Sequence, residues 1–283
     1  MEIFLATLAK GNTMDKKDLK KSYKLKNKEL KRKYKLDKKE LKSIYVADKT
    51  VTRDEYVEGV LNSIAENGKK KPVNPPKRAL LEEIGNAVSH GLGSAFATVA
   101  FILMLLSSTN GAEVFGAIVY FVGMLVMFTI SCLYHAFRNG GAVKRLFRRF
   151  DYSSIYLMIG GTFAPILLAY SDSRLAIWFF VIQWVLIVTG VTFIGIYGPT
   201  RLKWLHFPLY VVLGWCGVMF IPEMLMRADY LLFGLILGGG VTYSIGVIPF
   251  TMKKSVAHFI WHLFVLAGAV IQWIGVYAVI YLD

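Results

Sequence analysis

The stretch VFGAIVYFVGMLVMFTISCLY, residues 114–134, contains 21 residues and carries no charge. A helix needs about 20 predominantly apolar residues to cross the hydrocarbon core of a bilayer, so this stretch predicts a transmembrane helix. Six further stretches are similarly apolar: 87–107, 153–170, 175–196, 205–221, 230–250 and 256–281. Hydrophobic residues make up 55% of the 283-residue chain, which is high for a soluble domain. The sequence therefore predicts an all-α integral membrane protein with seven transmembrane helices.

The loops between these stretches differ in charge. The loops after the second, fourth and sixth apolar stretches hold nine basic residues: Arg138, Lys144, Arg145, Arg148, Arg149, Arg201, Lys203, Lys253 and Lys254. The loops between the other stretches hold only two basic residues, Arg174 and Arg227. The first residues show neither the basic segment nor the long apolar core of a signal peptide. Because Lys and Arg accumulate in cytoplasmic loops, the pattern predicts a cytoplasmic N-terminus and a C-terminus outside. We expect a multi-pass protein of the plasma membrane.

The formal net charge of +14 is concentrated before the first apolar stretch. Residues 1–80 hold 22 Lys and Arg against 11 Asp and Glu, and residues 18–50 form three 11-residue repeats in which Leu and Tyr recur at fixed positions. An 11-residue period places Leu and Tyr in one stripe of a basic helix. This stripe predicts self-association or binding to the anionic inner leaflet, and no nucleic-acid partner, with a solvated, partly ordered helix as the alternative. We expect a Lys-rich cytoplasmic helical region at 1–67, a Pro- and Lys-containing linker at 68–81, and the membrane domain at 82–283.

All the histidines fall at the predicted cytoplasmic ends of helices. They are His90 at the start of the first helix, His135 at the end of the second, His206 at the start of the fifth, and His258 and His262 at the start of the seventh. Asp151 opens the third helix at the same level, directly after a basic loop at 136–150. Ionisable residues at membrane depth are costly and point to function. The pattern therefore predicts a functional site at the inner ends of the helices.

The chemistry of this site is best explained by a metal ion. His258 and His262 are four residues apart, which places both rings on one face of a helix, about 6 Å apart along its axis. His135 would supply a third ligand, with Ser131 one turn before it on the same face. Three histidines and a water are typical of a catalytic zinc site, in which Asp151 would accept a proton from the water or orient a histidine. The alternative is that each histidine only caps helix carbonyls or lies at the membrane interface.

Four stretches together resemble the hemolysin III branch of the progestin and adipoQ receptor (PAQR) family. They are EEIGNAVSHGLGS (82–94), SCLYHAF (131–137), DYSSIYLMIGGTFAP (151–165) and HFIWHLFVLAGAV (258–270). The resemblance implies a seven-helix domain with zinc held near the inner surface by His135, His258 and His262, and with Ser131 and Asp151 beside it. Two positions depart from the family pattern: Tyr152 follows Asp151 where many bacterial members have histidine, and Gln272 stands where a further histidine is common.

Three functions are compatible with these residues. The first is a zinc-dependent hydrolase, in which Asp151 and Ser131 act on a lipid amide, as in a ceramidase, that enters between helices. The second is a channel-forming cytolysin, which needs a polar path across a bilayer that the apolar outer halves of the helices do not provide. The third is a non-catalytic sensor with a structural zinc, for which a fourth protein ligand is required. His90 and His206 are candidates for supporting or gating roles in any of them.

Overall fold

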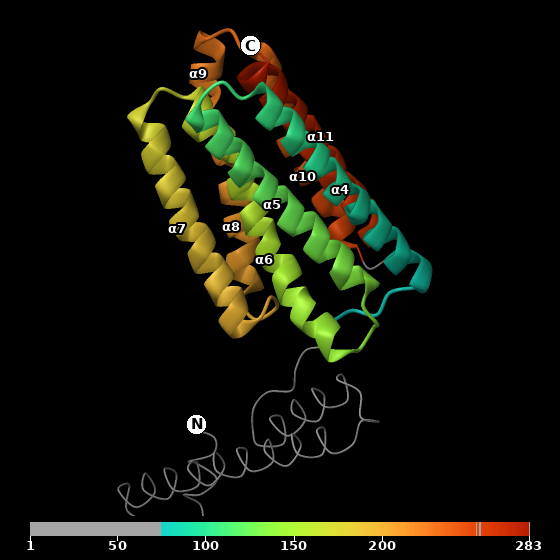
Figure 1. Cartoon of the computed structure of the whole chain (residues 1–283). Helices are drawn as coiled ribbons and strands as arrows, with labels where there is room; N and C mark the ends of the chain where they lie inside the picture. Colours follow the sequence, from blue (N-terminus) through green and yellow to red (C-terminus); the bar gives the residue numbers. More distant parts are fainter. Residues whose placement is uncertain (1–74, 253, 255, 283) are drawn as a thin grey trace, which may run out of the picture. The chain divides into compact units, whose positions relative to one another are not determined.

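The computed structural model describes residues 75–252, 254 and 256–282, and every regular element within these ranges is a helix (Figure 1). The elements are α4 (Leu80–Ser107), α5 (Gly111–Ala136), α6 (Ala142–Pro165), η1 (Ile166–Tyr170), α7 (Arg174–Tyr197), α8 (Lys203–Trp215), η2 (Cys216–Phe220), α9 (Ile221–Met226), α10 (Tyr230–Thr251), α11 (Ala257–Val276) and η3 (Tyr277–Tyr281). Seven helical segments in this part of the chain are long and apolar enough to cross a membrane. The predicted fold class is therefore confirmed. The N-terminal repeats lie outside the described residues, and the orientation of the chain in the membrane stays a prediction.

The helices run antiparallel along an elongated bundle (Figure 1). α4 packs between α5 and α11, α5 packs on α6, and α10 packs on α11, while α6 also contacts α7 and α8. This order brings the first and last spans together beside the second. The N-terminal ends of α4 and α11 and the C-terminal end of α5 consequently lie at the same end of the bundle.

A short polar turn fixes the pairing of α4 with α5. The Asn110 side chain caps α5 by accepting hydrogen bonds from the backbone N–H groups of Ala112 and Glu113, both at 3.0 Å. The Glu113 carboxylate in turn accepts from the backbone N–H of Thr109 at 2.6 Å. Because so few residues connect the two helices, they must lie side by side, and residues near the start of α4 face residues near the end of α5.

The contact between α5 and α6 depends on glycine. A Cβ atom at Gly123 would lie 2.5 Å from the backbone oxygen of Leu157, and one at Gly161 would lie 3.0 Å from the backbone oxygen of Val119. Small residues allow helix backbones to approach closely where lipid gives no hydrophobic force between helices. The close approach holds α6, which carries Asp151, against α5, which carries His135.

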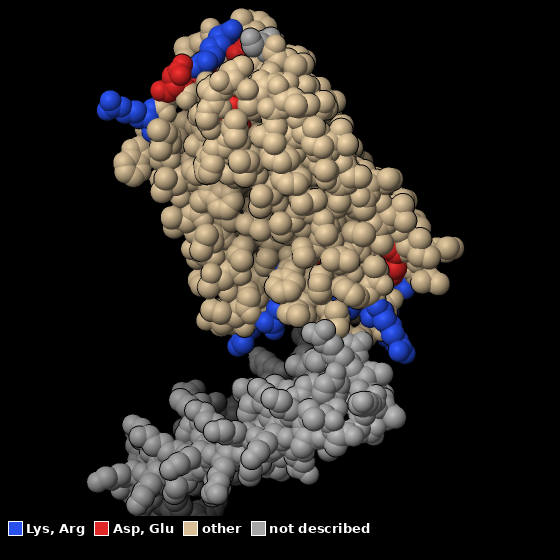
Figure 2. Space-filling view, viewed as in Figure 1, with Lys and Arg blue, Asp and Glu red and all other residues tan. Residues whose placement is uncertain are grey.

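The surface of the bundle has the pattern of a membrane-spanning domain. Large apolar side chains are exposed along its sides, among them Trp178, Val188 and Leu106. Figure 2 shows a broad uncharged band between two ends at which the described Lys, Arg, Asp and Glu residues gather. Such a band is what the hydrocarbon core of a bilayer requires.

Three predicted spans differ from the structure in extent. α6 begins at Ala142, so most of the predicted 136–150 loop is helical and Asp151 lies inside α6 instead of opening it. Lys144 is fully buried and Arg148 is 8% exposed. Lys144 tolerates this position because it is paired with Glu83. α4 begins at Leu80, before the predicted start at 87, and the fifth span extends to Met226 through η2 and α9.

Candidate metal centre

Three histidines from two helices converge at one end of the bundle. His135 lies in the last turn of α5, and His258 and His262 lie in the first two turns of α11. Each offers a ring nitrogen, and the three nitrogens all lie within 4.8 Å of one another. His135 and His262 are 2% exposed, and His258 is partly exposed. The antiparallel packing of spans that are far apart in sequence thus produces a compact histidine cluster.

The geometry of the α11 pair suits a shared ion. The Nε2 atoms of His258 and His262 are 3.2 Å apart. Two nitrogens bound to one tetrahedral zinc ion at 2.0–2.1 Å would lie about 3.3 Å apart. The same separation allows a hydrogen bond between the rings, so the two histidines are arranged to share either a proton or a cation.

The free ring nitrogen of His135 also fits a metal ion. His135 Nε2 is buried and has no hydrogen-bond partner among the described residues. Buried polar atoms without partners are uncommon in folded proteins, and a bound ion or water normally satisfies them. Neutral imidazoles are also the commonest protein ligands of zinc and related ions. The three histidines can therefore form a metal site.

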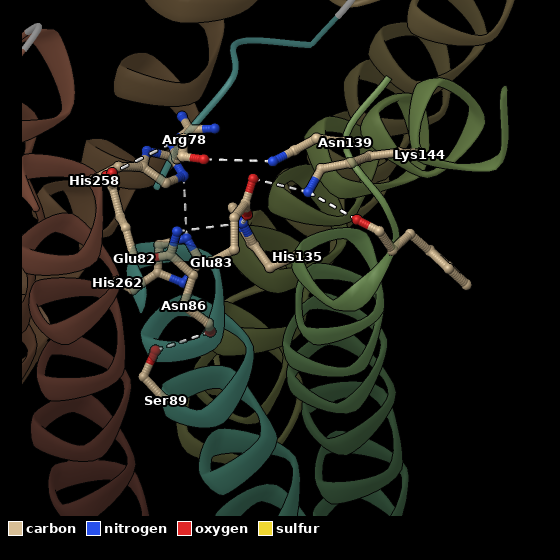
Figure 3. Close-up of polar contacts among 11 residues, drawn as sticks. Arg78, Glu82, Glu83, Asn86, Ser89, His135, Asn139, Lys144, His258 and His262 are labelled. Carbon is tan, nitrogen blue, oxygen red and sulfur yellow. Dashed lines mark hydrogen bonds and ion pairs between the residues drawn. The ribbon is translucent and has the colours of Figure 1, made fainter. Parts of the chain in front are cut away.

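The other face of His135 contacts residues that were given no role from the sequence. Its Nδ1 atom lies 2.5 Å from Glu83 Oε2 and 3.3 Å from Asn86 Nδ2 (Figure 3). The second carboxylate oxygen, Glu83 Oε1, accepts from Lys144 Nζ at 2.9 Å, and Lys144 also donates to the backbone oxygen of Phe137 at 3.1 Å. The sequence does contain a signal for Glu83 and Asn86, because their spacing from each other and from His90 places all three on one face of a helix.

Asp151 and Ser131 lie beside the cluster. Ser131 is buried on α5, and it lies close enough to the partly exposed Asp151 side chain to interact with its carboxylate. His135 and Arg148 are close enough to interact electrostatically with this carboxylate. Among the described residues, the group whose ligand atoms all lie within 4.8 Å consists of the three histidines and does not include Asp151. Ser131 and Asp151 thus lie beside the histidine cluster, and Asp151 is outside the three-histidine group.

The other two histidines have different surroundings. His90 belongs to the cluster because its ring stacks on His262, with 3.8 Å between ring centroids. His206 is a buried residue of α8 that is hydrogen-bonded to Tyr156 of α6, with 2.9 Å between His206 Nδ1 and the phenol oxygen. Gln272 donates to the backbone oxygen of Ile236 at 3.3 Å and connects α11 to α10. His206 and Gln272 therefore make helix-to-helix contacts of their own.

These features define a multi-pass helical membrane protein with a histidine cluster at one end of a seven-helix bundle. Comparison of the sequence with known protein families identifies the family to which this membrane protein belongs. A sequence model for the family described as "Haemolysin-III related" matches residues 78–273. The chain belongs to the hemolysin III and PAQR family, as the resemblance implied.

Individual relatives are bacterial and mammalian. The chain is 33% identical over 192 residues to Hemolysin-3 of Bacillus cereus, an alignment covering 66% of this chain and 87% of that protein. It is 31% identical over 192 residues to the Hemolysin-3 homolog of Bacillus subtilis (strain 168), covering 66% and 89%. It is also 25% identical over 226 residues to the human monocyte to macrophage differentiation factor, covering 76% and 89%.

Proposed function

We propose that this protein is a zinc-dependent membrane hydrolase that cleaves an amide bond in a lipid, as a ceramidase does. One observation carries the proposal: in the described residues the ligand set contains three histidines, and the Asp151 carboxylate lies beside it without joining it. Structural zinc sites have four protein ligands, whereas catalytic sites have three and keep one position open. The arrangement therefore favours a hydrolase over a sensor that uses zinc only to link α5 and α11.

The histidines and Asp151 have different roles in the proposed hydrolysis. A zinc ion held by His135, His258 and His262 would polarise the amide carbonyl and make water easier to deprotonate. Asp151 accepts the proton that the attacking water loses and returns it to the departing amine. The water oxygen bonds to the carbonyl carbon and the C–N bond breaks, which yields a fatty acid and a free amine.

Ser131 serves this scheme by positioning Asp151. A serine hydroxyl has one proton to donate, and the Asp151 carboxylate beside Ser131 is an acceptor for it. While Asp151 is ionised, the Ser131 hydroxyl is therefore committed to holding it toward the histidines. This role is favoured over stabilisation of the oxyanion, which would require the same proton.

The surroundings of the pocket support a lipid substrate. Apolar side chains on α4 and α11 are exposed at the same end of the bundle as the histidines, including Ile84, Val88 and Leu263. In a membrane these side chains contact acyl chains. A lipid whose acyl chains lie along these helices would have its polar head at the same end of the bundle as the histidines.

Fatty acid release from a panel of ceramides by zinc-loaded, detergent-purified protein tests this function. We expect release by the wild type and at least a 100-fold lower rate in Asp151→Asn, because the proton acceptor is lost. Asp172→Asn is the matched control, since that carboxylate has a side chain 94% exposed and pairs with Arg227. Absence of release by the wild type, or equal rates in wild type and Asp151→Asn, would reject the hydrolase. Red-cell lysis that persists after all three histidines are changed to alanine would favour a cytolysin.

A further inference from the structure

Glu83 is a buried carboxylate at the start of a membrane span, and the proposed hydrolysis gives it no role. It is 4% exposed, and its two oxygens contact side chains from two other helices. Oε2 lies against His135 of α5 and Oε1 against Lys144 of α6 (Figure 3). A buried charge is costly unless it is paired and hydrogen-bonded, and here both oxygens have partners. The position therefore calls for an explanation beyond packing.

The contact with His135 decides where that ring carries its proton. Glu83 Oε2 lies within hydrogen-bond distance of His135 Nδ1, and a hydrogen bond between them requires a proton on Nδ1 because an ionised carboxylate only accepts. Asn86 Nδ2 lies at 3.3 Å from the same nitrogen, and its N–H could donate only if Nδ1 had no proton. The shorter, charged contact prevails over the longer, neutral one.

In a neutral histidine ring, a proton on Nδ1 leaves Nε2 without a proton. His135 Nε2 then has a lone pair, and it is the buried nitrogen with no hydrogen-bond partner among the described residues. A histidine that donates its other N–H to a carboxylate is fixed in tautomer and orientation and becomes a better metal ligand. Glu83 thus prepares His135 Nε2 for the cation that the three-histidine group can hold.

Lys144 completes the arrangement. Its ammonium group is fully buried and donates both to Glu83 and to the backbone oxygen of Phe137, just beyond the end of α5. It supplies the opposite charge that the buried Glu83 carboxylate needs, and it ties the end of α5 to α6. One ion pair therefore sets both the tautomer of His135 and the position of the helix end that carries it.

We propose that the Glu83–Lys144 pair is a positioning device that holds His135 as the Nδ1-protonated tautomer and thereby determines metal affinity. The inference rests on the metal site of the proposed function and does not depend on any hydrolysis. Neighbouring Glu82 shows why the position is specific. It is 8% exposed and lies on the same helical turn, but its carboxylate faces Arg78, with 3.8 Å between Arg78 Nε and Glu82 Oε1.

The test is the zinc dissociation constant of zinc-depleted full-length protein, measured by competition with a chromophoric chelator. We expect Glu83→Gln and the double variant Glu83→Gln/Lys144→Met to bind zinc about 10- to 100-fold more weakly than wild type. The double variant leaves no unpaired charge, so it separates positioning from general destabilisation. Glu82→Gln is the control and keeps wild-type affinity. Wild-type affinity in both Glu83 variants, or an equal loss in Glu82→Gln, overturns the proposal.

A second measurement needs no change at Glu83. The nitrogen NMR shifts of ¹⁵N-histidine-labelled protein distinguish the two tautomers of His135, whose signals are assigned by their loss in His135→Gln. We expect Nδ1 to carry the proton, and a proton on Nε2 overturns the proposal even if the Glu83 variants fail to fold. A wild type that binds zinc and shows this tautomer, but hydrolyses no ceramide, would reject the proposed function and leave the positioning role intact.

Discussion

His135, His258 and His262 differ in what holds each ring. His258 and His262 are oriented by a single helix, because a spacing of four residues places their rings on one face of α11. His262 is further held by stacking on His90. His135 comes from another helix and is oriented by the Glu83 carboxylate instead. The pocket therefore combines a local pair with one ligand whose position depends on contacts between helices.

One buried ion pair joins α4 and α6 at the end of α5. Lys144 of α6 and Glu83 of α4 meet beside the end of α5, at 2.9 Å between Nζ and Oε1. Removing one partner leaves the other buried and uncompensated. α5 and α6 are also joined nearer the middle of the bundle, where Gly123 and Gly161 let their backbones approach closely.

Substitution of Lys144 alone is therefore expected to destabilise the bundle. Lys144→Met leaves the Glu83 carboxylate buried and unpaired, at an expected loss of about 3–5 kcal/mol in the free energy of unfolding. The double variant Glu83→Gln/Lys144→Met removes both charges and should recover most of that loss. Reversible denaturation in mixed micelles measures both. A single variant as stable as the double variant would show that the pair does not hold the helices together.

The extent of the spans shows what a sequence can and cannot predict. Seven apolar stretches predicted seven spans because the thickness of a membrane sets the length of a span. Successive spans cross the membrane in opposite directions, which placed every histidine at the same end of the bundle. The start of α6 was missed because Lys144 and Arg148 resemble loop residues until their surroundings are known. Lys144 and Glu83 are 61 residues apart, and Glu83 and His135 are 52 apart. Such pairings depend on helix packing, which hydropathy does not encode, whereas the spacing of His258 and His262 could be recognised from the helical repeat alone.

The described seven-helix bundle presents an apolar band between two polar ends (Figure 2). The loop at 137–141 and the loop at 171–173 lie at opposite ends of the bundle, because α6 and η1 cross it between them. The excess of Lys and Arg in alternate loops predicts that the first of these loops is cytoplasmic and the second is outside. This orientation would place the histidine pocket at the cytoplasmic face.

Labelling of intact cells with a membrane-impermeant thiol reagent tests this orientation. The single cysteines are Asp172→Cys and Asn139→Cys, both at exposed positions, in a background with Cys132 and Cys216 changed to alanine. We expect Asp172→Cys to react in intact cells, and Asn139→Cys to react only after the cells are opened. The reverse pattern would place the pocket outside.

Metal analysis of matched histidine variants will show whether this chain holds a metal ion at its histidine cluster. His262→Ala removes a member of the three-histidine group, and His206→Ala removes an equally buried histidine that contacts Tyr156 instead. We predict about one zinc per chain in the purified wild type and in His206→Ala, and loss of most of it in His262→Ala. A wild type with little bound metal, or equal metal content in the two variants, would contradict the account.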